Sequence, residues 1–287
     1  MSGLSPRSPS GPGVSRFVQR GEHRLSYESR GEPGAPPVLI LHDLLAARGQ
    51  LRDLSEALTN AGWEAVLADV RGHGASPFIS GPSYPPAELA ADAVAVLEAE
   101  GLPTARVVAF GWSALIALEL AARFPERVGG IVLVEPYLPA LLADHPNEEA
   151  QKYGAAHLEA LSQAADASYK GLTDRALDLY PGVRWGTGWR DHIPKPRLGA
   201  IRRSAPSLAA LLTTLGQAAT GETLAAVQTP VTMLVRRNSR NAEQWNAEAL
   251  ALRVPGAGIL NVEIGAGIPP ADVWTSSIVK ALGKPGT

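Results

Sequence analysis

Short apolar runs alternate with helical stretches along most of the chain, and this alternation limits the possible folds more than any other feature. Residues 38–41 (Val-Leu-Ile-Leu), for example, contain no polar residue. Such a strand is typical of a parallel sheet that helices cover on both faces. The strands predicted in this way are residues 38–41, 64–69, 106–110, 130–134, 231–235 and 259–264.

The stretches between these strands have apolar residues at helical spacing. In the first of them, Leu51, Leu54 and Leu58 lie on one face, and Gly62 follows as a stop signal. Further helices are predicted over residues 86–97, 113–124, 207–215, 242–252 and 272–282. Strands that alternate with helices form βαβ units, so the sequence predicts an α/β fold with a mostly parallel sheet.

The alternation stops at Pro136 and resumes after about residue 204, with more charges and isolated aromatic residues in between. We therefore predict a core of residues 16–136 and 206–287 and an inserted helical cap of residues 137–205. Ligands of open α/β sheets bind at the carboxyl ends of the strands, so a cap there would cover the ligand site. Residues 1–15 are rich in Ser, Gly and Pro and are predicted to be a disordered lead.

Composition excludes several kinds of site. The 287 residues include no cysteine, which rules out a thiol nucleophile, a disulfide and a Cys-ligated metal; we expect no metal and no cofactor. A net charge of −2 gives no reason to expect nucleic acid or an anionic membrane as a partner. No apolar segment is long enough to span a bilayer. We expect a cytoplasmic protein with a small-molecule partner, and the sequence does not fix the oligomeric state.

Residues 107–115 (Val-Val-Ala-Phe-Gly-Trp-Ser-Ala-Leu) contain the most informative motif. A buried strand, a tight turn and an immediate helix form a nucleophile elbow, whose pattern is G-x-S-x-G. Gly111 and Ser113 match the first and third positions, and Leu115 replaces the final glycine. We predict that Ser113 is an elbow serine with strained backbone angles. The alternative is that Ser113 only caps the following helix.

Three further segments, in the right order, resemble the α/β-hydrolase superfamily. Residues 39–43 (Leu-Ile-Leu-His-Asp) are similar to the strand that leads into its oxyanion loop, and residues 69–76 match its Asp-x-Arg-Gly-His-Gly-x-Ser segment. Residues 124–128 (Phe-Pro-Glu-Arg-Val) resemble the end of its elbow helix. The resemblance extends from about residue 16 to residue 282 and implies a capped α/β-hydrolase fold.

The resemblance also implies roles for individual residues. Ser113 would attack a carbonyl carbon, and the backbone N–H groups of Leu44 and Ala114 would hold the resulting oxyanion. Asp43 lies beside this position, where its carboxylate would repel the charge that the amides should stabilise. His42 and His73 belong to loops whose histidines are usually structural in this family.

The usual partners of the serine are absent. The family places its acid after the strand that follows the cap, where this chain has Arg236, Arg237 and Arg240 and no carboxylate. It places its histidine after the last strand, where this chain has Ile268. A serine is a weak nucleophile without a base that a third group orients, so the resemblance implies a degenerate catalytic triad.

Substitutes for the missing groups are available. Glu135 follows the strand after the elbow and is a possible acid, or an ordinary loop carboxylate. His145, His157 and His192 lie in the cap, where each is either a base or a surface histidine. The three arginines either face solvent or bind an anionic group. The remaining candidates are residues that would contact a substrate: Asp43, Trp112, Trp185, Trp189 and Ile268.

Three functions follow from these observations. The main hypothesis is a non-hydrolytic member of the superfamily, a pseudoenzyme that binds a small, largely apolar molecule. The first alternative is an active hydrolase of an ester or a related bond, or a cofactor-independent enzyme, with a non-standard base. The second is a protein-interaction module, because a fold alone does not determine a function.

Overall fold

The computed structural model describes residues 14–79, 84–186, 188–215, 221–237, 241–264 and 271–285. Its eight-stranded sheet has the order β1-β2-β4-β3-β5-β6-β7-β8. β1 and β2 are antiparallel to their neighbours, and the strands from β4 to β8 in this order are parallel. The strands are β1 (Arg16–Arg20), β2 (His23–Arg30), β3 (Pro37–Leu41), β4 (Glu64–Ala68), β5 (Ala105–Phe110), β6 (Val128–Val134), β7 (Val231–Arg236) and β8 (Gly258–Val262). The predicted α/β fold is confirmed.

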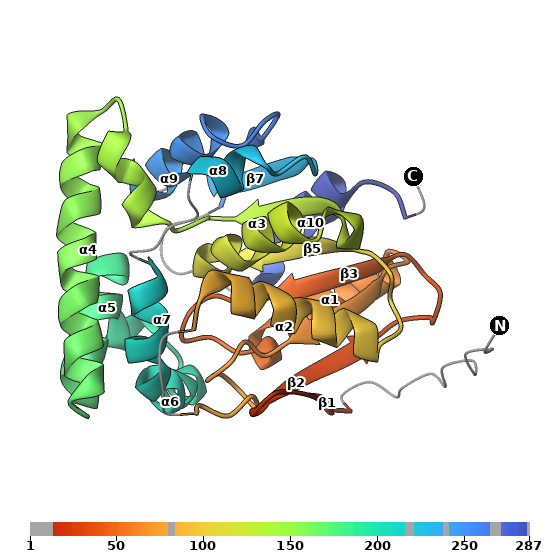
Figure 1. Cartoon of the computed structure of the whole chain (residues 1–287), viewed down its shortest axis with the longest axis horizontal. Coiled ribbons are helices and arrows are strands. Elements are labelled where there is room, and N and C mark those ends of the chain that lie inside the picture. The colour runs from red at the N-terminus through yellow and green to blue at the C-terminus, as the bar shows by residue number, and fades with distance from the viewer. Residues whose placement is uncertain are drawn as a thin grey trace.

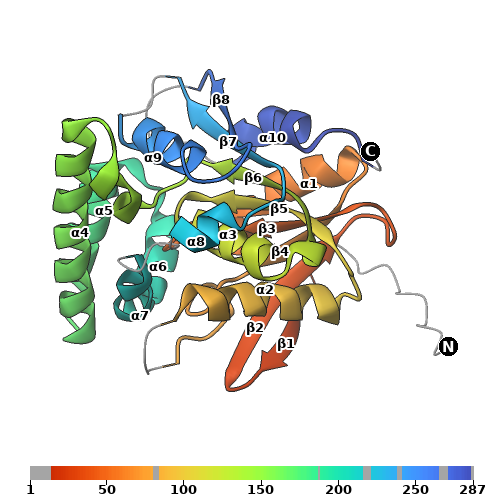
Figure 2. The same ribbon diagram turned by 45° about the horizontal axis from the view of Figure 1, so that its top comes forward.

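Helices cover both faces of this sheet (Figures 1 and 2). Alternate side chains of β3 show why its apolar run has no polar residue. Val38 and Ile40 pack in a cluster with helices α1 and α10, whereas Leu39 and Leu41 pack in the larger cluster with α2 and α3. The helices are α1 (Arg52–Asn60), α2 (Pro86–Ala99), α3 (Ala114–Arg123), α4 (Glu148–Tyr169), α5 (Thr173–Trp185), α6 (Lys195–Ser204), α7 (Leu208–Leu215), α8 (Gly221–Ala225), α9 (Asn241–Ala251) and α10 (Thr275–Leu282).

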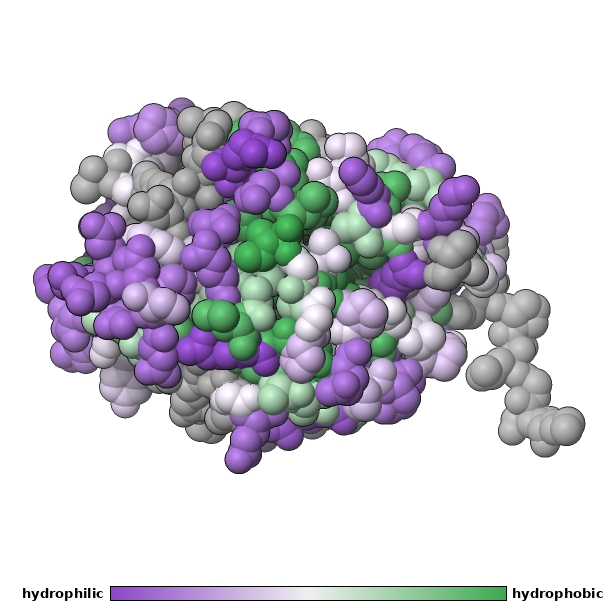
Figure 3. Space-filling view, turned by 90° about the horizontal axis from the view of Figure 1, so that it is seen from above, coloured by the Kyte–Doolittle hydropathy of each residue, from purple (hydrophilic) through white to green (hydrophobic). Residues whose placement is uncertain are grey.

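Helices α4 to α7 follow β6 and lie together at one end of the sheet, at the left of Figure 1. α4 is amphipathic: residues at spacings of three and four, from Ala150 through Gly154 and His157 to Leu161, are buried. Its outer side is exposed, and this end of the molecule is largely hydrophilic in Figure 3. The cap boundaries at residues 137 and 205 stay a prediction, and most of the predicted lead lies outside the described residues.

No helix in the described part of the chain combines the length and the apolar character that crossing a membrane requires.

Candidate functional site

The turn after β5 differs from the prediction. It begins with the 3-10 helix η2 (Gly111–Ser113), and its left-handed residue is Gly111, with φ +54°. Ser113 has helical angles, φ −66° and ψ −6°, so the prediction that this serine is strained is wrong. Only a residue without Cβ adopts the left-handed conformation at little cost, which explains glycine at this position. The elbow therefore lies two residues earlier than the motif predicted.

Ser113 is fully buried beneath this turn. Its hydroxyl donates a hydrogen bond to the backbone carbonyl of His42 at the end of β3. The side chain makes no capping bond to α3 either, so neither interpretation of Ser113 describes its contacts. Its hydrogen bond links the turn after β5 to the end of the neighbouring strand β3.

The carboxylate of Asp43 occupies the space that a side chain at position 111 would need. A Cβ atom placed on Gly111 would overlap all three carboxylate atoms of Asp43. In an elbow, the nucleophile is carried by the strained residue of the turn. This chain has glycine at that residue, and a carboxylate from the loop after β3 takes the place of the nucleophile.

Two backbone amides hold the Asp43 carboxylate. Oδ1 accepts hydrogen bonds from the amide of Leu44, at 2.8 Å, and from that of Trp112, at 2.9 Å. One amide follows β3 and the other follows the strained residue, which is how an oxyanion hole is built in this architecture. Leu44 has the predicted position, but its partner is Trp112, because the amide of Ala114 bonds to the carbonyl of Gly111 within the turn.

An arginine from the cap also binds the Asp43 carboxylate. Arg184 lies near the end of α5 and donates a hydrogen bond to the Asp43 carboxylate. Its Nη1 lies 2.9 Å from Oδ1 and 2.8 Å from Oδ2. Its Nη1 also lies 3.2 Å from the hydroxyl of Tyr180, whose pKa burial raises to about 12. The guanidinium carbon lies 4.5 Å from the ring centroid of Tyr137. The sequence did not single out Arg184, because its partner lies 141 residues away.

The substitute acid is already paired. Glu135 has φ 46°, and its Oε1 accepts a hydrogen bond from Nε of Arg236 at 2.6 Å. Arg237 forms an ion pair with Glu263. The predicted anion-binding role of these two arginines is therefore taken up by carboxylates of the chain itself. Arg240 and Ile268 lie outside the described residues.

Among the cap histidines, His157 points inward. Its Nδ1 lies 2.7 Å from the hydroxyl of Tyr137, and its ring centroid lies 3.6 Å from that of Tyr153. Burial lowers its pKa to about 4, so it is neutral at pH 7. Nε2 of His145 lies 3.4 Å from Glu248, and His192 is exposed. The partner of His157 is thus a tyrosine and not Ser113.

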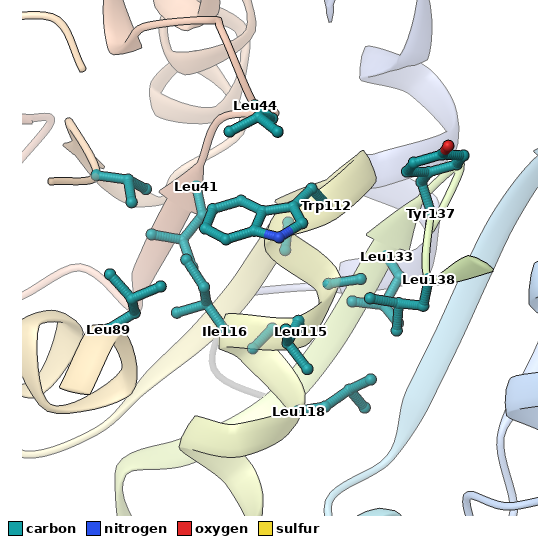
Figure 4. Close-up of a cluster of buried hydrophobic side chains, with 14 of the residues drawn as sticks. Leu41, Leu44, Leu89, Trp112, Leu115, Ile116, Leu118, Leu133, Tyr137 and Leu138 are labelled. Carbon is teal, nitrogen blue, oxygen red and sulfur yellow. The ribbon is translucent and has the colours of Figure 1, made fainter. Parts of the chain in front are cut away.

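The three tryptophans have different surroundings. Trp112 is fully buried, and Figure 4 shows its indole within a cluster of apolar side chains that includes Leu41, Leu44 and Ile116. Within the described ranges its Nε1 has no hydrogen-bond partner. Trp185 and Trp189 pack edge to face, with ring centroids 5.6 Å apart. Trp189 is buried and Trp185 is half-buried, so Trp185 is the more exposed of the two indoles.

Two loop histidines are structural, as expected. His42 accepts a hydrogen bond from the amide of Val70, and His73 accepts one from the amide of Leu45. Burial lowers the pKa of His42 to about 4 and that of His73 to about 3. Both rings are therefore neutral when they fix the loop that carries Asp43.

The lowered pKa values of three buried histidines predict that the folded protein is less stable in acid. His42, His73 and His157 have folded-state pKa values below the unfolded value of about 6.5. Between about pH 6.5 and 4 the unfolded chain binds more protons, so the free energy of unfolding falls as the pH falls through this window. We expect a loss of at least about 2 kcal/mol between pH 7 and pH 5, measured by urea unfolding.

His157→Gln should reduce this pH dependence, and His192→Gln, at an exposed position, should not. Equal stability of the wild type at pH 7 and pH 5 would contradict the interpretation of the three histidines.

No cluster of three or more potential metal ligands occurs among the residues that the structure describes. The described chain also contains two non-glycine residues with positive φ, Leu45 and Glu135. Both follow strands that flank β5, and Leu45 lies in the loop that carries Asp43. Strained backbone persists where surrounding structure enforces it, and it is frequent at functional sites.

Comparisons with known proteins agree with this architecture. Residues 36–170 match the family model described as alpha/beta hydrolase fold. The chain is 34% identical over 156 residues to a pimeloyl-[acyl-carrier protein] methyl ester esterase of Chromobacterium violaceum, covering 54% of this chain and 56% of that protein. It is 31% identical over 131 residues to epoxide hydrolase A of Mycobacterium tuberculosis, covering 45% and 41%.

These matches span about half the length of the curated relatives. Among solved structures, an alpha/beta hydrolase from Sphaerobacter thermophilus superposes with a TM-score of 0.74 at 18% identity. That superposition covers 93% of this chain and 100% of the other. At this identity the likeness supports the fold alone.

Proposed function

Because the chain belongs to the α/β-hydrolase superfamily but has glycine at the strained residue of the elbow, we propose that it binds a small molecule between sheet and cap without acyl transfer. The observation that carries this proposal is the overlap between a side chain at position 111 and the carboxylate of Asp43. A hydrolase that used the family's covalent route would need a nucleophile at that position.

Two further features support the proposal. The amides of Leu44 and Trp112 already hold a carboxylate oxygen, so a substrate oxygen has no free place between them. Arg236 is the last residue of β7, the strand after which the family places its acid, and it forms an ion pair with Glu135. Loss of triad members reduces turnover by several orders of magnitude, so little acyl transfer is expected.

The names of the relatives favour a second candidate, an active hydrolase. The curated relatives described above are named as an esterase and an epoxide hydrolase. In this chain, such an activity would require Asp43 to leave the two amides and a water molecule to replace the side-chain nucleophile. His157, hydrogen-bonded to Tyr137, is the cap histidine that could then serve as a base.

An activity assay separates the two candidates. We expect the purified protein to hydrolyse p-nitrophenyl acetate, p-nitrophenyl butyrate and styrene oxide no faster than the buffer. Ser113 is fully buried and its hydroxyl donates a hydrogen bond to a carbonyl, so a fluorophosphonate probe should not label it. Ser113→Ala should match the wild type in both measurements.

Turnover that survives dialysis and is lost in Ser113→Ala would contradict the proposal and support the hydrolase. Turnover that is retained in Ser113→Ala and lost in His157→Gln would assign catalysis to the cap histidine.

A further inference from the structure

A second cap arginine, Arg197, lies close enough to the Asp43–Arg184 pair for their charges to act on it. Arg197, in α6, is partly buried, and its guanidinium carbon lies 6.0 Å from the ring centroid of Trp185. Over the described ranges, its guanidinium has no hydrogen bond and no ion pair. Burial lowers its pKa, and the charges of Asp43 and Arg184 also act on it. A partly buried cation is stabilised by an anion, and among the described residues no carboxylate forms an ion pair with Arg197.

The charges of Asp43 and Arg184 do not balance the positive charge of Arg197. The carboxylate of Asp43 bonds to Arg184, and its charge also acts on Arg197, so there is one anion for two cations. Two other arginines of the cap have partners of their own, since Arg190 pairs with Asp178 and Arg202 with Asp174. A monoanionic ligand would balance the charge of Arg197.

The geometry around Asp43 also fits a carboxylate. Its Oδ1 accepts from two backbone amides, and both of its oxygens lie within hydrogen-bond distance of Arg184. Charge-assisted bonds of this kind are the strong ones, and arginine favours planar oxyanions. Asp43 is therefore an internal model of the group that the site recognises. The half-buried indole of Trp185 provides an aromatic face next to Arg197.

We propose that this site binds a small aromatic monocarboxylate, whose carboxylate pairs with Arg197 in competition with Asp43 and whose ring packs on Trp185. This inference rests on the proposed function and names its ligand class. It makes Arg197 a residue that determines specificity for an anion over a neutral molecule of the same shape.

Matched pairs of ligands, each a carboxylate and its amide, test whether binding depends on the negative charge of the ligand. Benzoate and cinnamate are titrated against benzamide and cinnamamide, with tryptophan fluorescence and calorimetry as readouts. We expect the carboxylates to bind at least about tenfold more tightly than the amides, the effect of about 1.4 kcal/mol of charge-assisted bonding. Arg197→Gln should remove this preference, and Arg197→Lys should keep part of it.

Arg202→Gln is the control, because Arg202 lies on the same helix, is exposed and pairs with Asp174. It should leave the preference unchanged. Equal binding of carboxylates and amides, no binding of either at millimolar concentration, or an unchanged preference in Arg197→Gln would overturn the inference. Ester hydrolysis that depends on a residue of this site would instead overturn the proposed function, so the two failures are distinguishable.

Removal of the internal carboxylate provides a second test. In Asp43→Ala, the two amides and Arg184 lose their partner, and benzoate should raise the melting temperature more than in the wild type. Benzamide should not. Asp43→Asn, which keeps the shape and removes the charge, serves if the alanine variant does not fold. An equal shift with benzoate in variant and wild type would exclude competition with Asp43.

Discussion

Gly111→Ala should destabilise the protein by about 3 kcal/mol or more. The left-handed backbone, φ +54°, costs alanine about 1 kcal/mol, and the new Cβ would expel the Asp43 carboxylate from its position. Asp43 would then lose its bonds to Leu44 and Trp112, a further loss of about 2 kcal/mol or more. Urea unfolding at pH 7 measures the difference.

Gly171→Ala is the matched control. Gly171 also has positive φ, +72°, but a Cβ there would meet no atom within 4 Å, so only the backbone term of about 1 kcal/mol applies. A double-mutant cycle with Asp43→Ala isolates the overlap. The two substitutions should destabilise together by less than their sum, because the carboxylate is then absent. Additive effects would show that Gly111 and Asp43 do not compete for space.

Arg184→Met should destabilise the protein by about 2 to 3 kcal/mol. Arg184 is largely buried, with 9% of its side chain exposed, and its removal leaves the Asp43 carboxylate without its cation between sheet and cap. Removing one partner of a buried ion pair is strongly destabilising. Because Asp43 is 22% exposed, the expected loss is smaller than for a fully buried pair.

Arg190→Met is the control for Arg184→Met. Arg190 forms an ion pair with Asp178 in the same cap, but both side chains are exposed, so the expected loss is below about 1 kcal/mol. Equal losses in the two variants would mean that the Asp43–Arg184 pair is no stronger than a surface pair.

The sequence predicts the sheet better than the site, for a physical reason. A strand such as β3 buries both faces, so its own residues carry the signal. The elbow is harder, because small residues occur at positions 109, 111, 113 and 114 and the pattern fits more than one register. The backbone angle that selects Gly111 is a property of the folded turn.

The groups that define the site also differ in how far they could be predicted. The sequence identifies Asp43 as a charge beside the oxyanion position, because the strand before it has a family pattern. Its role as the occupant of that position depends on Trp112 and Arg184, 69 and 141 residues away. No local pattern indicates such pairs. The helix that carries Arg184 has Pro181 and Gly182 in its interior, but these residues say nothing about the partner of Arg184.

The shared space of Gly111 and Asp43 orders the steps by which a covalent catalyst could be rebuilt on this scaffold. A serine introduced at position 111 alone would meet the resident carboxylate and act as a folding defect before it acted as a nucleophile. Asp43 must be replaced first, and this replacement leaves Arg184 of the cap without its counterion. A nucleophile at position 111 therefore requires at least two substitutions, because the Asp43 carboxylate already occupies the space.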